Sequence, residues 1–234
     1  MKYIAHRGAC LEATEDTLEA LERGAAYGAF AVECDPRPTK DGVRVIFHDW
    51  NLRRLAGDDR NVSDLTLDEM RASLARVGIE LTTFDDVIRK YRGRSAVLFD
   101  ISYDASFDEE LFKTLRDAPF RVIAGIHKVK EAELAARYLP RENILAFLPG
   151  PEEAEAFHAA GCGILRLWEQ WLDTVTPADI RARVGECEVW IMSCDVNNRH
   201  PLFCMNGSPA SVARVKALGA DGILLNDIRM ASML

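Results

Sequence analysis

The chain has 234 residues, which is enough for one compact domain with a full hydrophobic core. Acidic residues outnumber basic ones by 37 to 29, and no run of basic residues supplies the cationic stripe that nucleic-acid binding needs. The opening MKYIAHRG is too short for a secretory apolar region, and about 18 uncharged apolar residues never run together. We therefore expect a cytoplasmic protein without nucleic-acid or stable membrane partners.

The six cysteines are scattered along the chain without any CxxC pair. This spacing argues against a zinc cage, and a disulfide framework is unusual in a chain of this size. We expect buried free thiols at Cys10, Cys34, Cys162, Cys187, Cys194 and Cys204.

Short apolar or β-branched runs alternate with amphipathic stretches from one end of the chain to the other. This alternation is typical of parallel βα units rather than of hairpins. The predicted strands are Tyr3–Ala5, Ala31–Asp35, Ala96–Ile101, Arg121–Ile126, Ile144–Leu148, Gly163–Leu167, Glu188–Ser193 and Gly222–Leu225. Eight such strands predict a closed (β/α)₈ barrel, an α/β fold, in a single domain over residues 1–234.

Helix boundaries are indicated by local signals. Thr17 precedes LEALERGAAYG, Pro151 opens EEAEAFHAAG, and Ser208-Pro209 opens ASVARVKALG, with glycine closing each pattern. Between about residues 37 and 83 the alternation is interrupted: GVRVIFHD follows a TKDG turn as a strand, and SDLTLDEMRASL reads as a short capped helix. We interpret this region as an insertion after the second strand.

The longest segment without a pattern is CDVNNRHPLFCMNG, after the seventh strand. Long ordered loops of barrels are often functional. Leu202, Phe203 and Met205 would then cover an active site, or would instead pack against a neighbouring loop or a second subunit; homo-oligomerisation is left open.

Reacting groups of (β/α)₈ barrels gather at the carboxyl ends of the strands, where this chain places several acids. Glu33 and Asp35 are two residues apart, so both side chains should point to the same side, and Asp100 ends the next strand. Close carboxylates repel unless a cation intervenes, and hard oxygen ligands suit Mg²⁺ or Ca²⁺. The alternative is a set of exposed strand-end acids that cap helix N-termini.

Two histidines also follow strands at this end, His6 after the first and His48 at the end of the inserted strand. A pair of imidazoles can take a proton from a nucleophile and give one to a leaving alkoxide, which phosphodiester cleavage requires. Arg7 offers a donor fork for phosphoryl oxygens, and Arg166 is a weaker second phosphate ligand. The other histidines, His127, His158 and His200, are weaker candidates. Two tryptophans, Trp168 and Trp171, either form an aromatic wall against the substrate or fill a barrel or subunit interface.

Several motifs follow one another along the chain: HRG, the acidic residues before Thr17, VECDPRPTKDGVRVIFHD, SDLTLDEM, LTTFDDV and GADGILLND. In this combination the chain resembles the glycerophosphodiester phosphodiesterases, of the phospholipase C-like phosphodiesterase superfamily. The motifs are spread from residue 4 to residue 227. The resemblance implies metal-dependent hydrolysis of a small-molecule glycerophosphodiester to sn-glycerol 3-phosphate and an alcohol. It places His6 and His48 on the acid and base, Arg7 on a phosphate ligand, and Glu33 and Asp35 on the metal ligands.

The chain departs from the family's usual pattern at three places. Asp100-Ile101-Ser102 replaces an E-x-K, Met192-Ser193 replaces a Trp-Thr pair, and Asp16 replaces an asparagine. These changes remove a cation and an aromatic wall, so the usual diester should bind less well unless Arg166, His127 or Lys128 compensates. Three alternatives remain: a different diester, for example one containing a sugar; a cyclising phospholipase of the sphingomyelinase D kind; and a catalytically silent phosphodiester-binding barrel.

Overall fold

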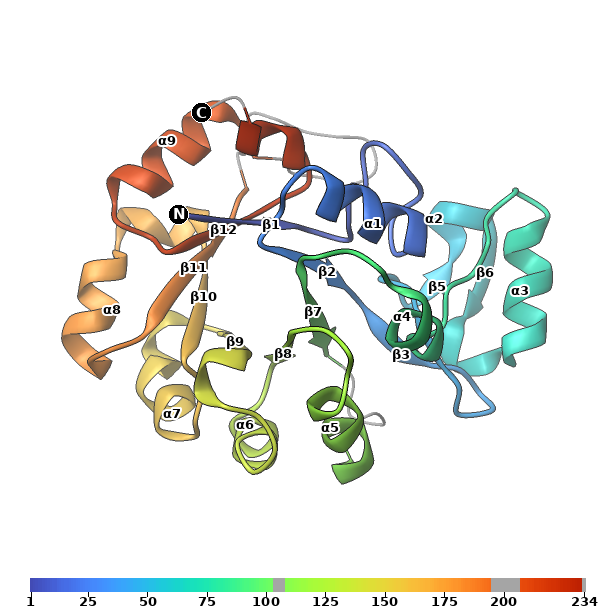
Figure 1. Cartoon of the computed structure of the whole chain (residues 1–234), viewed down its shortest axis with the longest axis horizontal. Coiled ribbons are helices and arrows are strands. Elements are labelled where there is room, and N and C mark those ends of the chain that lie inside the picture. The colour runs from blue at the N-terminus through green and yellow to red at the C-terminus, as the bar shows by residue number, and fades with distance from the viewer. Residues whose placement is uncertain (103–107, 195–206, 233–234) are drawn as a thin grey trace.

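The computed structural model describes residues 1–102, 108–194 and 207–232, and within these residues eight parallel strands close into a barrel (Figure 1). The strands follow the chain in order around the barrel, so the predicted (β/α)₈ topology is confirmed. Each lies within two residues of its predicted bounds. They are β1 (Lys2–Ala5), β2 (Ala31–Cys34), β7 (Ala96–Ile101), β8 (Val122–Ile126), β9 (Ile144–Phe147), β10 (Ile164–Trp168), β11 (Glu188–Met192) and β12 (Gly222–Leu225).

Helices surround the barrel: α1 (Leu18–Ala26), α4 (Phe84–Lys90), α5 (Glu109–Arg116), α6 (Val129–Ala135), α7 (Ala154–Ala159), α8 (Pro177–Val184) and α9 (Pro209–Ala217). The Thr17 and Ser208 side chains accept hydrogen bonds from the first turns of α1 and α9, as their sequence positions predict. The prediction at Pro151 needs a correction. Pro151–Glu153 form a 3₁₀ turn, and the α-helix begins only at Ala154. Further 3₁₀ turns span Arg141–Asn143, Glu169–Asp173 and Ile228–Ser232.

Apolar side chains fill one end of the barrel. Trp190 is fully buried inside it, and its indole N–H donates to Glu188. Gly222 lies against that ring, where an added Cβ would stand 2.9 Å from the indole. Phe30 meets Trp190 edge-on at 6.0 Å, and Lys2 pairs with Glu188. This packing seals the amino ends of the strands and leaves the carboxyl ends for polar groups.

The insertion lies beside the barrel as two small antiparallel sheets and two helices (Figure 1). Its elements are β3 (Pro36–Pro38), β4 (Arg44–Ile46), β5 (Asn51–Leu52), α2 (Arg53–Ala56), β6 (Asp58–Asn61), a 3₁₀ turn at Val62–Asp64, and α3 (Leu67–Ala75). It has its own core, which includes Leu52, Met70 and Leu74. The inserted strand is shorter than predicted. β4 ends at Ile46, so His48 stands in the loop beyond it rather than at the strand end.

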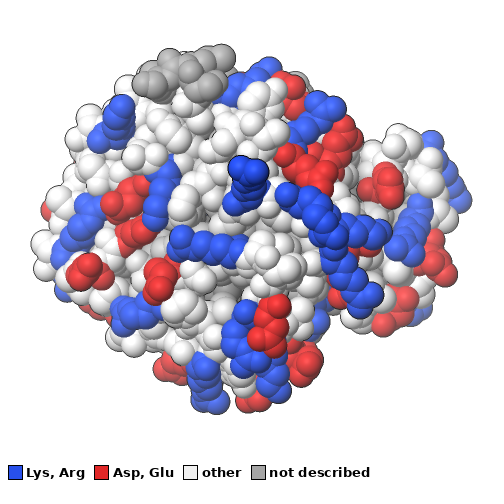
Figure 2. Space-filling model, viewed as in Figure 1, with Lys and Arg blue, Asp and Glu red and all other residues white. Residues whose placement is uncertain are grey.

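Four cysteines are buried free thiols, as predicted, while Cys187 is a free thiol that is only partly buried. Cys204 and the segment proposed as a lid, including His200, Leu202, Phe203 and Met205, lie outside the described residues. No helix in the described ranges is both long and apolar enough to cross a membrane. Acidic and basic side chains are interspersed over the face shown in Figure 2.

Candidate functional site

A cavity of about 200 Å³ opens among residues at the carboxyl ends of the barrel strands. One part of it is lined by five candidates from the sequence: His6, Arg7, Glu33, His48 and Asp100. Its remaining lining includes His127, Phe147, Arg166, Trp168 and Met192. Residues from the barrel and from the insertion therefore meet in one hollow.

The turn after β1 holds Arg7 at the edge of this cavity. Arg7 has a left-handed backbone, with φ of 57°, and its amide donates to Glu33 Oε2 at 2.7 Å. Gly8 follows with φ of 73° and lies against the backbone of α1. A Cβ at Gly8 would stand 2.5 Å from the carbonyl carbon of Ala20. Glycine is thus required here both for conformation and for space.

We expect Gly8→Ala to lower the free energy of unfolding by about 3 kcal/mol. An alanine is strained in the left-handed backbone conformation, and its Cβ would also overpack the contact with α1. Gly28→Ala is the matched control, since Gly28 also has positive φ, 80°, but has no atom within 4 Å of the added Cβ. It should cost only about 1 kcal/mol. Urea unfolding of both variants measures the difference. Equal losses would show that the contact with α1 contributes nothing.

Three carboxylates converge beside this turn. Oxygen atoms of Glu33, Asp35 and Asp100 lie within 4.8 Å of one another. Glu33 and Asp35 are 1% and 3% exposed, and Asp35 Oδ2 has no hydrogen-bond partner among the described residues. Burial raises the pKa of Asp35 to about 6, and burial followed by the charges of Asp35 and Asp100 raises that of Glu33. A divalent cation bound by oxygen fits this cluster, because it would offset the repulsion and satisfy the unpaired oxygen.

A fourth acid lies next to the cluster. Asp16 is buried, has φ of 59°, and accepts a hydrogen bond from the amide of Asp35 through Oδ1. Its Oδ2 has no partner in the described part of the chain. Burial and the charge of Asp35 raise the pKa of Asp16 well above its usual value. Asp16, at the position where the resemblance leads us to expect an asparagine, therefore adds an acid next to Asp35.

Each of the two predicted histidines has its Nδ1 held by an oxygen. His6 Nδ1 lies 2.6 Å from Asn226 Oδ1, and its Nε2 lies 3.8 Å from Glu33 Oε2. His48 Nδ1 lies 2.8 Å from Asp49 Oδ1. Burial, followed by the charge of Arg7, lowers the pKa of His6 well below its usual value. With Nδ1 as the donor in both rings, each Nε2 is left for proton transfer.

A hydrogen-bonded chain of side chains links His48 to Arg7. Arg54 donates through Nε to Asp49 Oδ2 at 2.7 Å and through both terminal nitrogens to Glu15. Glu15 also accepts from Arg7 at 3.0 Å. Although Asp49 is partly buried, its bonds to His48 and Arg54 hold its pKa far below the usual value. The chain fixes the orientation of His48 and Arg7 together, and sequence reasoning missed Arg54 and Asn226.

The opposite part of the cavity carries Arg166, which is 6% exposed. Its Nε and Nη1 have no hydrogen-bond partner among the described residues. Nearby, His127 Nε2 lies 2.6 Å from Asp100 Oδ1. His127, a weak candidate in the sequence, therefore contacts one of the three converging carboxylates. Trp168 lines the cavity, whereas Trp171 packs against the core around the barrel.

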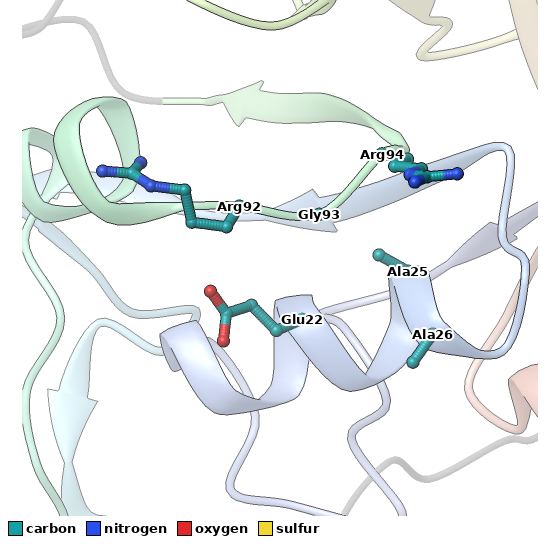
Figure 3. Close-up of a pocket in the computed structure, with 6 residues that line it drawn as sticks. All are labelled: Glu22, Ala25, Ala26, Arg92, Gly93 and Arg94. Atoms are coloured by element: carbon teal, nitrogen blue, oxygen red, sulfur yellow. The ribbon is translucent and has the colours of Figure 1, made fainter.

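A second hollow lies outside the barrel, between α1 and the segment that joins α4 to β7 (Figure 3). Arg92 and Arg94 line it together with Glu22. The two guanidinium groups point in opposite directions, so they do not converge on one ligand. The chemistry-bearing residues gather instead in the barrel cavity.

A sequence model of the glycerophosphoryl diester phosphodiesterase family matches residues 6–132, more than half of the chain. The chain belongs to this family. The match runs from His6 through the insertion to α6, and so includes both histidines and all three converging carboxylates.

Curated relatives of this glycerophosphoryl diester phosphodiesterase family member align over a limited segment. A lysophospholipase D of Mus musculus is 40% identical over 70 residues, which are 30% of this chain and 21% of that protein. Glycerophosphodiester phosphodiesterase 1 of Rattus norvegicus is 41% identical over 68 residues, 29% of this chain and 20% of that protein. The aligned part thus spans about a fifth of the length of these two relatives.

Solved structures share the whole fold. A glycerophosphodiester phosphodiesterase from Thermotoga maritima superposes with a TM-score of 0.77 at 19% identity, covering 99% of this chain and 96% of that one. A phosphodiesterase from Oleispira antarctica, in complex with the product sn-glycerol-3-phosphate, gives a TM-score of 0.73 at 20% identity, with 99% and 96% covered. At such identities the likeness establishes the barrel fold of this family member.

Proposed function

We propose that the protein hydrolyses a glycerophosphodiester to sn-glycerol 3-phosphate and an alcohol, using a divalent cation, Mg²⁺ or Ca²⁺. The observation that carries the proposal is that two oxygen-held histidines line one cavity with Glu33 and Asp100, two of the three converging carboxylates, in a chain of this family. The name of the rat relative and the bound product in the Oleispira antarctica structure support the same substrate class.

Glu33, Asp35 and Asp100 would hold the cation in this proposal. When bound, the cation supplies Lewis-acid stabilisation of charge on the phosphoryl oxygens. The protein holds the carboxylates ready. Arg7 donates its amide to Glu33, and His127 contacts Asp100. These partners fix the direction of the ligand oxygens.

His6 and His48 move the protons. Hydrolysis forms a bond from phosphorus to the attacking oxygen and breaks the bond from phosphorus to the leaving oxygen. One proton leaves the attacking hydroxyl, and another reaches the departing alkoxide. His6, neutral with Nδ1 bonded to Asn226, suits the first transfer. His48, with Asp49 behind it to stabilise an imidazolium, suits the second.

Arg7 and Arg166 would bind the phosphoryl group. Arg7 is oriented by Glu15, and Arg166 presents, from the other side of the cavity, N–H groups that have no partner among the described residues. Arg166 lines the cavity whereas Ser102 does not, so in this proposal Arg166 supplies the positive charge of the missing lysine. A planar guanidinium binds phosphoryl oxygens with defined geometry.

A catalytically silent phosphodiester-binding barrel is the second candidate, because Ser102 and Met192 stand where the family usually has a lysine and a tryptophan. ³¹P NMR of glycerophosphodiesters incubated with the protein and Mg²⁺ or Ca²⁺ separates the candidates. Our proposal predicts a growing phosphomonoester signal for sn-glycerol 3-phosphate. Accumulation of a cyclic phosphate would indicate a cyclising enzyme, and an unchanged spectrum with saturable ligand binding would indicate the silent barrel.

A further inference from the structure

Arg166 occupies an unusual position for an arginine. It lies on β10, which is separated from β2 by three strands in either direction around the closed barrel and therefore faces β2 across it. β2 carries Glu33, and Asp35 follows it directly. The cavity consequently has an acidic wall and, opposite to it, a cationic wall made by Arg166.

The Arg166 guanidinium is buried and forms no ion pair with a described residue, although the charge of Asp100 acts on it. Burial lowers its pKa to about 10, which still leaves it protonated near neutral pH. Two of its buried nitrogens donate to nothing among the described residues. Taking an ion out of water without a partner is costly, and an anion that enters the cavity would recover that cost.

The aromatic faces near Arg166 are already used by this cation. The guanidinium carbon lies 4.9 Å from the centroid of the Phe147 ring and 4.3 Å from the Trp168 ring. His127 stacks on Phe147 with ring centroids 4.8 Å apart. Quaternary ammonium groups are recognised by open aromatic faces of this kind. In this cavity Arg166 already occupies the aromatic faces, so a cationic ligand would be repelled by the guanidinium instead of binding to the rings.

We propose that Arg166 selects phosphodiesters whose alcohol group is uncharged, such as glycerol or inositol, and disfavours those with a cationic group, such as choline or ethanolamine. This inference rests on the proposed function. Repulsion between the head group and Arg166, weakened by the bound phosphate, should reduce kcat/KM for cationic diesters by about tenfold relative to neutral ones.

The test compares four diesters that share the glycerol 3-phosphate half and carry glycerol, inositol, choline or ethanolamine. Release of sn-glycerol 3-phosphate is measured for the wild type, Arg166→Gln and Arg166→Lys. We expect a neutral-to-cationic ratio of kcat/KM of about ten in the wild type, a similar ratio in Arg166→Lys, and a ratio near one in Arg166→Gln.

A folded Arg166→Gln protein that does not turn over still reports the ratio, through calorimetric dissociation constants for the same four diesters. A wild type that cleaves choline and glycerol diesters equally well would overturn the inference and leave the proposed function intact. So would a ratio that Arg166→Gln does not change. A wild type that releases nothing from all four would instead count against the proposed function.

Discussion

Replacing His48 with glutamine is expected to lower kcat by about 10²–10⁴-fold, the usual contribution of a positioned acid or base. Glutamine retains size and hydrogen bonding but cannot transfer a proton at neutral pH. His48 follows β4 on the loop of the insertion and is 40% exposed at its side chain, so its replacement should leave the barrel core undisturbed. The measurement is steady-state release of sn-glycerol 3-phosphate, with thermal unfolding as a check on folding.

His158→Gln is the matched control. His158 lies on α7, outside the cavity, and within the described part of the chain its Nε2 meets the backbone oxygen of Glu186. We expect kcat of this variant to remain within about twofold of the wild type, as for most surface substitutions. If His48→Gln were as active as His158→Gln, the assignment of His48 to proton transfer would be wrong.

Asp35→Asn is expected to weaken binding of Mg²⁺ or Ca²⁺ by more than about 100-fold. This loss exceeds the one usual when a residue that only supports a metal ligand is replaced. The neutral amide removes one of three converging charges and offers a weaker oxygen ligand. In the absence of metal the variant should be at least as stable as the wild type, because repulsion between Asp35 and Glu33 is relieved.

Calorimetry and thermal unfolding with and without the cation measure this effect independently of turnover. A cation at about 100 times its dissociation constant should stabilise the wild type by about 2.7 kcal/mol, and Asp35→Asn should show almost none of this gain. Asp59→Asn serves as the control, since Asp59 is an exposed acid that pairs with Arg53. Equal stabilisation of all three proteins by the cation would exclude Asp35 as a metal ligand.

Most of the barrel is predictable from the sequence because its strands are short, predominantly apolar runs. Parallel strands covered by helices bury both faces, so runs such as Ala96–Ile101 and Gly222–Leu225 stand out and their bounds agree with the structure. The insertion is less predictable. Its strands β3, β5 and β6 have two to four residues, which is too short for a hydrophobic period to appear.

The residues of the candidate site also differ in how well the sequence predicts them. Side-chain alternation and position at the strand ends are enough to select Glu33, Asp35 and Asp100 as candidates, and the structure pairs the two strands concerned, β2 and β7. Partners that depend on long-range packing do not. Asn226 meets His6 from the other end of the chain, and Arg54 reaches Glu15 from the insertion. Asn226 stands within the GADGILLND motif, but nothing in that motif marks it as the partner of His6, and no local pattern singles out Arg54.

Metal-dependent hydrolysis by the two histidines is tested most directly by measuring sn-glycerol 3-phosphate release from glycerophosphoglycerol after the protein has been stripped with a chelator and then supplied with Mg²⁺ or Ca²⁺. The proposed mechanism predicts no release from the stripped protein, recovery with at least one of the two cations, and no recovery in a His6→Ala variant that still binds the cation. Release that persists in the chelator, or that is unchanged in His6→Ala, would contradict it.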